Sequence, residues 1–179
     1  MKTEEQQEIK ILILIAYISY AVNPTRTSLN KLIYFCDVIS FLKNKEEVTK
    51  IPYQKKQYGP VPQDIDIYRS VLIEKGILKE NVYSDGYSTT YVYDISPNSI
   101  EPILKLFDKY FNNKEKTIIE DVCKHLGNKK AIELSNITHE MKPWRDSEYF
   151  DVLKSSDVDR ESLNKLFKEY NIDYEIVVN

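Results

Sequence analysis

Two short blocks of this 179-residue sequence combine side chains suited to recognition with a backbone of limited freedom. The first is Tyr58-Gly59-Pro60-Val61-Pro62, where glycine permits an unusual backbone angle and the prolines fix theirs. The second runs from Ser135 to Trp144 and contains His139. Rigid aromatic anchors lose little entropy on binding, so we predict that both blocks meet in one partner-binding surface. The predicted partner-binding residues are Tyr53, Tyr58, Gly59, Pro60, His139 and Trp144.

The second block also has a purely structural interpretation. Thr138 and His139 fall in the last turn of an expected helix, where a hydroxyl and an imidazole can satisfy free carbonyl groups. Trp144 can then fold back over that helix end and pack there. The sequence leaves both interpretations of the block open.

Catalytic chemistry has little support in the sequence. His125 and His139 lie fourteen positions apart, and neither belongs to a pattern with zinc-ligand spacing. Cys36 and Cys123 form no C-x-x-C pair and lie in apolar helical patterns, as expected for buried thiols in a reducing cytoplasm. The 4 glycines build neither of the two common nucleotide-binding loops. We therefore expect a protein that is not an enzyme and needs no metal and no cofactor.

Nucleic-acid binding is the alternative function. A helix ending at Gly76, then Ile77-Leu78, then a hairpin with a polar tip is the order of a winged-helix module, which favours a DNA-binding transcriptional regulator of a phage or mobile element. The side chains expected to face a DNA groove are Gln63, Asp64, Asp66, Arg69 and Glu74. No Lys or Arg lies between Glu80 and Ile100, whereas phosphate contacts need basic side chains. This surface is therefore expected to repel DNA.

Overall charge points the same way. The 25 basic and 28 acidic residues give a net charge of -3, too balanced for a nucleic-acid or membrane footprint. The stretch Lys43 to Lys56 holds five Lys and two Glu, which suits either a nucleic-acid contact or a solvated loop. The longest apolar run, Ile11 to Ala16, is short for a membrane span. We expect a cytoplasmic protein without a membrane or nucleic-acid partner.

Apolar periodicity predicts a single mainly helical domain over residues 1–179 with a small β element, a winged-helix-like helix plus hairpin. The central pair is expected at Glu4 to Val22 and from Thr27 or Ser28 to Lys43, and Lys43 to Lys56 is expected to be extended at the surface. Ile77 to Ile95 is predicted to form a short hairpin. The remaining helices are expected to end at Lys75 and to span Asn98 to Phe111, Lys116 to Leu126, Asn128 to Glu140 and Asp159 to Tyr170.

The carboxyl-terminal region is acidic and ends in a possible strand. Glu140 to Asn179 holds ten acidic and six basic residues, and Asp173 to Val178 has the composition of a strand. We expect this strand to extend the edge of the domain's own sheet, with strand exchange to a partner as the second possibility.

Three blocks of the chain, in family order, resemble the Panacea domain of SocA-like antitoxins, a family of bacterial and phage genomes. Leu29 to Asp37 is similar to its "KLLYFAD" helix, with Cys36 at the usual alanine position; Tyr58 to Pro62 is similar to "YGPV", and Ser135 to Trp144 to "THE…PW". The resemblance covers about residues 12–154. It implies a non-enzymatic antitoxin that neutralises a cognate toxin by direct binding, and the SocA type also delivers its toxin to a AAA+ protease. The resemblance implies no oligomeric state.

Overall fold

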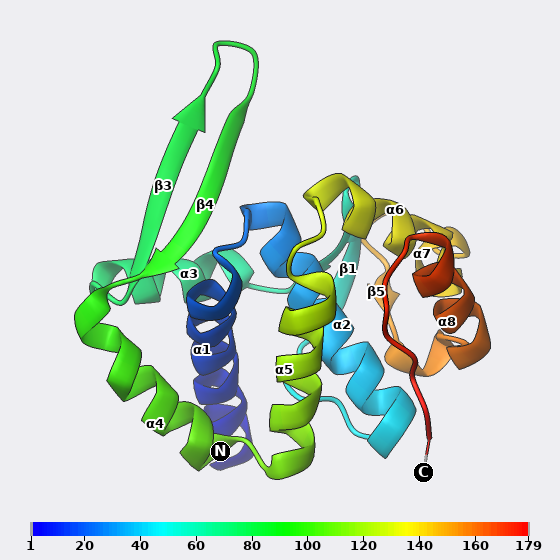
Figure 1. Ribbon diagram of the computed structural model, residues 1–179, viewed down its shortest axis with the longest axis horizontal. Helices are drawn as coiled ribbons and strands as arrows, with labels where there is room; N and C mark the ends of the chain where they lie inside the picture. Colours follow the sequence, from blue (N-terminus) through cyan, green and yellow to red (C-terminus); the bar gives the residue numbers. More distant parts are fainter. Residues whose placement is uncertain (1, 179) are drawn as a thin grey trace.

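A computed structural model describes residues 2–178, and two helices lie at its centre, α1 (Lys2–Val22) and α2 (Arg26–Asn44) (Figure 1). α1 is mostly exposed at its start and largely buried from Ile11 to Ser19. α2 buries fourteen of its residues. The predicted central pair is therefore confirmed.

The start of α2 corrects the sequence prediction. The N-cap is Thr25, whose hydroxyl accepts a hydrogen bond from the Ser28 amide at 3.1 Å. Thr27 and Ser28 lie inside the first turn and cap nothing. The cap sits directly after Pro24, because the chain leaves α1 through Asn23 at a positive φ of 52° and turns at once into α2.

A three-stranded antiparallel sheet packs against α2. It has the order β2-β1-β5 and consists of β1 (Tyr53–Lys56), β2 (Gly59–Pro62) and β5 (Val152–Leu153). The predicted rigid block at Tyr58 to Pro62 thus contains the second strand, β2, of a tight hairpin in which Lys56 pairs with Gly59. The segment Lys43 to Lys56 is not simply a surface segment, because its Val48, Thr49 and Tyr53 are buried.

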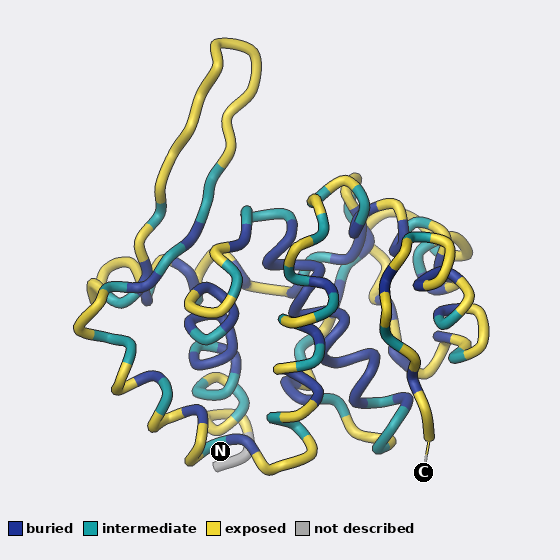
Figure 2. The backbone as a smooth tube through the Cα atoms, in the orientation of Figure 1, coloured by how far each residue is buried: buried dark blue, intermediate teal, exposed yellow. Residues whose placement is uncertain are grey.

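The second sheet is a hairpin that projects from the body (Figure 1). Helix α3 (Ile65–Glu74) ends before Gly76, which has a φ of 68°, and leads into β3 (Leu78–Ser84) and β4 (Thr89–Ile95). Seven consecutive residue pairs form the ladder, more than the short hairpin expected. Residues 81–90, called the arm below, are all exposed (Figure 2).

Two helices cover the other side of α1 and α2. The 3₁₀ turn η1 (Pro97–Ser99) leads into α4 (Ile100–Tyr110), which packs on α1 through stacked rings of Tyr17 and Phe107, 3.8 Å between centroids. α5 (Asn113–Leu126) packs on α2 and begins three residues before the predicted Lys116. Its early start follows from a capping box, in which Asn112 and Glu115 exchange side-chain and backbone hydrogen bonds.

The chain ends in short elements beside α2. They are α6 (Ala131–Glu140), α7 (Lys142–Arg145), the 3₁₀ turn η2 (Ser155–Asp157) and α8 (Arg160–Glu169). The predicted strand at Asp173 to Val178 is wrong, since this segment is extended but joins neither sheet. Instead, the Asn164 side chain accepts from the Ile176 amide at 2.8 Å and donates to the Ile176 carbonyl at 3.1 Å. One side-chain amide thus takes the place of a neighbouring strand.

The fold is mainly helical, as predicted, and it contains two small antiparallel sheets where the sequence predicted one small β element. One hydrophobic cluster contains side chains from Ile11 in α1 to Ile176 in the carboxyl-terminal segment. Within residues 2–178, none of the helices is long and apolar enough to cross a membrane.

Candidate partner-binding site

The β1–β2 hairpin lies directly on α6, so the two blocks singled out in the sequence meet. Ser135 donates a hydrogen bond to the Tyr58 carbonyl at 3.0 Å. Gly59 has a φ of 103°, and a Cβ there would lie 2.5 Å from Thr138 Oγ1 and 2.6 Å from Lys31 Cε. Only glycine fits this backbone angle and this contact. The close approach fixes the turn against the helix.

Lys31 holds the same hairpin from below. Its side chain is 1% exposed, and Nζ donates to the Pro60 carbonyl at 2.8 Å. Burial lowers the pKa of Lys31 to about 7. The amine therefore acts mainly as a hydrogen-bond donor inside the core.

His139 and Trp144 form a stacked pair at the end of α6. Their rings lie 4.0 Å apart between centroids at 25°, and Trp144 Nε1 donates to the Lys56 carbonyl at 3.2 Å. Burial, assisted by the charge of Lys31, lowers the pKa of His139, which favours the neutral imidazole at pH 7. Thr138 Oγ1 donates to the Ser135 carbonyl at 2.8 Å, a bond inside α6 rather than to the free carbonyls at its end, so it does not test the capping interpretation of this block. Both side chains of the stacked pair remain partly exposed.

Tyr53 does not reach this surface. It is 1% exposed, and its hydroxyl donates to Asp37 Oδ2 at 2.5 Å. Asp37 also accepts from the amide of Thr49 at 2.7 Å and from its hydroxyl at 2.5 Å. Burial raises the pKa of Asp37 to about 6, although these hydrogen bonds oppose the shift. Tyr53 therefore anchors β1 to α2 and offers no contact to a partner.

Of the other predicted residues, Gly59 and Pro60 are buried and position the hairpin, whereas Tyr58 is 59% exposed. Two exposed aromatic residues that the sequence prediction missed, Tyr149 at 55% and Phe150 at 65%, precede β5 and lie along the edge of β1 opposite to β2. Lysine side chains tie these rings to β1. Lys55 Nζ lies 4.1 Å from the Trp144 ring centroid and 5.6 Å from that of Tyr149. Lys56 Nζ lies 4.1 Å from the ring centroid of Phe150.

Phe150 occupies a backbone conformation that normally belongs to glycine. Its φ is 72°, and its amide donates to the Lys55 carbonyl at 3.0 Å, while the Lys55 amide donates to the Asp151 carbonyl at 3.0 Å. Phe150 and Asp151 thus both lie opposite Lys55, which makes a β-bulge whose first residue, Phe150, is in the left-handed region. A bulky exposed side chain there costs about 1–2 kcal/mol. The pairing of the bulge with Lys55 fixes this backbone angle and leaves the Phe150 ring exposed.

We call the resulting surface the aromatic face. It comprises Tyr58, Trp144, Tyr149, Phe150 and Lys56, and the buried Lys55 supports the rings of Trp144 and Tyr149 from within. The signal that could have found its missing members was the dipeptide Tyr149-Phe150 close after the second block, which no apolar periodicity explains.

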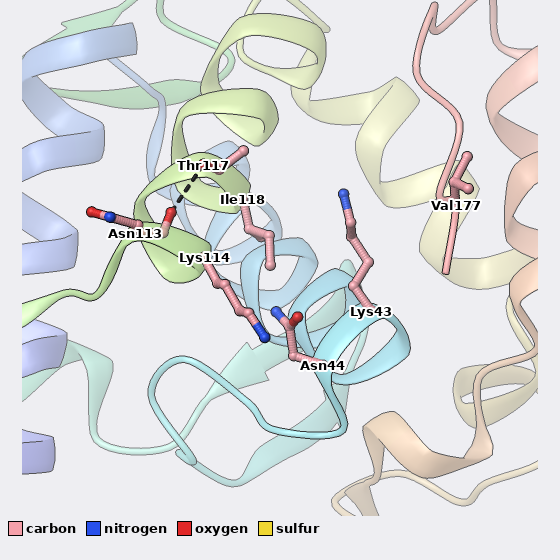
Figure 3. Close-up of a pocket in the computed structure, with 7 residues that line it drawn as sticks. All are labelled: Lys43, Asn44, Asn113, Lys114, Thr117, Ile118 and Val177. Carbon is pink, nitrogen blue, oxygen red and sulfur yellow. Dashed lines mark hydrogen bonds between the residues drawn. The ribbon is translucent and has the colours of Figure 1, made fainter. Parts of the chain in front are cut away.

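A separate groove of about 370 Å³ lies between the end of α2, the start of α5 and the carboxyl-terminal segment (Figure 3). Lys43 and Lys114 line it, and Thr117 Oγ1 donates to the Asn113 carbonyl at 2.9 Å. The groove contains no acid, imidazole or thiol to activate that hydroxyl. No group of three or more potential metal-ligating side chains occurs in the described part of the chain.

The structure also shows the surroundings of the two cysteine thiols and of Arg69, the basic residue predicted to face DNA. Burial raises the pKa of the Cys123 thiol to about 12, and Cys36 is fully buried. Arg69, predicted to face a DNA groove, is buried with its guanidinium 5.6 Å from the Tyr93 ring centroid and paired with Asp66. It therefore offers no phosphate contact.

Comparison with known proteins gives one match. The family model described as antitoxin SocA-like, Panacea domain, matches residues 29–145, more than half of the chain. This range runs from α2 to the end of α7 and includes Tyr58, His139 and Trp144. No curated protein and no solved structure gave a significant match.

Proposed function

The chain belongs to the SocA-like antitoxin family with a Panacea domain, and we propose from this premise that it neutralises a cognate toxin by binding it through the aromatic face. Family membership is the observation that carries the antitoxin role and implies a toxin partner. It also fits a protein that acts without catalysis, since the family is generally non-enzymatic.

The chemistry of the aromatic face supports its choice as the toxin-binding surface. Tyr58, Tyr149 and Phe150 are each more than half exposed, while the hairpin, α6 and the bulge fix the backbone that carries them. Aromatic anchors on a fixed backbone dominate interface energies because little freedom is lost on binding. A toxin surface with an apolar patch and an acidic rim would complement these rings and Lys56.

The test uses Phe150→Gly and Tyr58→Ala with the cognate toxin, identified as a neighbouring reading frame that arrests growth when expressed alone. We expect each substitution to weaken binding by about 30-fold, near 2 kcal/mol, in titration calorimetry. Phe150→Gly should leave the free energy of unfolding within about 1 kcal/mol of the native chain, since relief of the left-handed angle offsets the lost contact. Growth rescue on co-expression should fall in parallel with affinity.

Ile67→Ala is the matched control, because Ile67 is 61% exposed but lies in α3. It should bind the toxin like the native chain. If Phe150→Gly and Tyr58→Ala bind as tightly as this control, the aromatic face is not the toxin-binding surface. If the native chain neither binds the toxin nor restores growth, the antitoxin proposal itself fails.

Two other outcomes separate related functions. Delivery of the toxin to a AAA+ protease predicts that the toxin's half-life in cells shortens when this protein is present, whereas simple occlusion leaves it unchanged. The DNA-binding alternative predicts a sequence-dependent gel shift that weakens steeply with salt. The arm carries Asp85 as its single charged side chain and Arg69 is buried, so we expect no such shift.

A further inference from the structure

The arm of the β3–β4 hairpin has an open outer edge. The Ser96 amide donates to the Ile77 carbonyl and the Asp85 amide to the Ser88 carbonyl, which fixes the alternation of the ladder. In an antiparallel pair, hydrogen-bonded and non-bonded pairs alternate. The amides and carbonyls of the even-numbered residues therefore point outward from β3. These residues are Glu80, Val82 and Ser84.

The two edges of the hairpin differ. At the base of β4, the Tyr93 amide donates to the Pro24 carbonyl at 2.9 Å, and Thr25 pairs with Val92. The outward backbone groups of β3 from Glu80 to Ser84 make no hydrogen bond within residues 2–178. This stretch also has no proline, lysine or bulge, the usual devices that protect an edge strand.

A two-stranded ribbon of this length is marginal in water without a further strand. Residues 81–90 are all exposed, and they include Val82 at 57%, Tyr83 at 61% and Tyr87 at 100%. A regular ladder and open backbone groups on an unsupported ribbon indicate a surface for β-strand addition.

We propose that β3 of a second copy of this chain pairs antiparallel with β3, about a two-fold axis through Val82. In this register Val82 faces the second copy's Val82, and Glu80 faces the second copy's Ser84. All three outward residues are then hydrogen-bonded, with about six bonds across the junction. The two ribbons become one four-stranded sheet, and the same patch serves both copies, as a two-fold dimer requires.

Charge complementarity selects this partner and this register. With Val82 at the centre, Lys79 lies directly opposite the second copy's Asp85, and the reciprocal pair forms at the other end. A shift of the partner strand by two residues places Lys79 opposite Tyr83 or Tyr87 and loses both pairs. Directly opposite charges of opposite sign stabilise an antiparallel pair. Asp85 Oδ1 accepts the turn amides of Tyr87 and Ser88, Ser88 Oγ lies 3.3 Å from Oδ2, and the residue is exposed to an approaching lysine.

The dimer does not depend on the antitoxin role. The arm projects upward from the left half of the molecule, whereas α7 and α8 lie at its right end (Figure 1). The aromatic face, with Trp144 on α7, therefore stays free when two arms pair.

The first test is a disulfide across the axis. Directly opposite, hydrogen-bonded residues have Cα atoms about 5.5 Å apart, within the range a disulfide spans. Val82→Cys should therefore give a covalent dimer under mild oxidation. The matched control Tyr87→Cys is fully exposed but lies past the turn, about eight residues, roughly 25 Å, from its copy. Cross-linking of both variants alike, or of the native chain through Cys36 or Cys123, overturns the proposal.

The second test measures the oligomeric state by light scattering over a micromolar to millimolar concentration series. The native chain should form a dimer, and Val82→Pro should weaken it at least about tenfold. The Val82 amide points outward, so proline there spares the hairpin's own ladder, and circular dichroism should be unchanged. Asp85→Asn keeps the turn cap but removes the ion pair, so its dimer should be weaker and less salt-dependent. A native chain that stays monomeric throughout, or a Val82→Pro variant that dimerises like the native chain, overturns the proposal.

Discussion

Lys31 places an amine inside the core, 1% exposed, with the Pro60 carbonyl as its hydrogen-bond acceptor. Burial of the charged form is costly, so the folded state binds the proton of Lys31 less readily than the unfolded chain does, with a pKa near 7 against 10.5. No carboxylate within the described residues forms an ion pair with it. Lys31 therefore links the stability of the candidate site to pH.

The direction of this linkage follows from the lowered pKa. Between pH 7 and 10.5 the unfolded chain carries more protons on Lys31, so stability rises with pH across this window and gains nothing below it. We expect the native chain to be roughly 2 kcal/mol more stable at pH 9 than at pH 7 in urea unfolding. Lys31→Met should remove most of this rise. An equal slope in both proteins would show that Lys31 titrates normally in the folded state.

Elements with long apolar periodicity could be predicted from the sequence, and short ones could not. α1 and α2 present many apolar side chains to the core, and this pattern outweighs local variation. β5 has two residues and α7 has four, so neither carries a readable period. The segment Asp173 to Val178 has strand composition, but the bonding partner of Ile176 is a side chain on α8, which composition does not reveal.

The same limit applies to the candidate site. Rigid backbone and rare side chains predicted that Tyr58 and the His139 to Trp144 turn would meet, and the hydrogen bond from Trp144 to Lys56 joins them. Tyr53 was misplaced because β-strand side chains alternate, and its register against Pro62 puts it on the buried side. Phe150 was missed because its exposure follows from a bulge, which depends on pairing with Lys55 far away in the sequence.

Asn164 makes the two backbone hydrogen bonds to Ile176 that a neighbouring strand would make, so the carboxyl-terminal segment should depend on this side chain. Asn164→Leu leaves both Ile176 backbone groups without their partner, so we expect a loss of about 1–3 kcal/mol in the free energy of unfolding. Hydrogen exchange of the Ile176 amide should also accelerate. The exposed neighbour Lys165 is the control, and Lys165→Met should change neither quantity. A stable Asn164→Leu variant with a protected Ile176 amide would mean that other contacts hold the segment.

For the whole molecule, the family match and the folding unit have different boundaries. The match begins at Leu29, inside α2, and therefore excludes α1. α1 nevertheless contributes Ile11, Leu14 and Ile18, all 0% exposed, to the central hydrophobic cluster. α2, α3, α4, α5 and β4 all contact this helix. The region matched by the family model thus contains one of the two central helices, α2, and lacks the other, α1, which completes the core.

Because α1 lies in the core but outside the matched region, that region should not fold by itself. A fragment of residues 29–145 should lack a cooperative thermal transition, because removing α1 and the core side chains of residues 146–179 exposes the faces of α2 and α4 that they bury, and each large buried side chain contributes about 1.5–3 kcal/mol. Total stability of a domain is only about 5–15 kcal/mol, so the loss of several such side chains exceeds it. A chain of residues 4–179 is the control and should melt like the native protein, since α1 is largely exposed before Ile11. A sharp transition in the 29–145 fragment, measured by circular dichroism, would show that the core closes without α1.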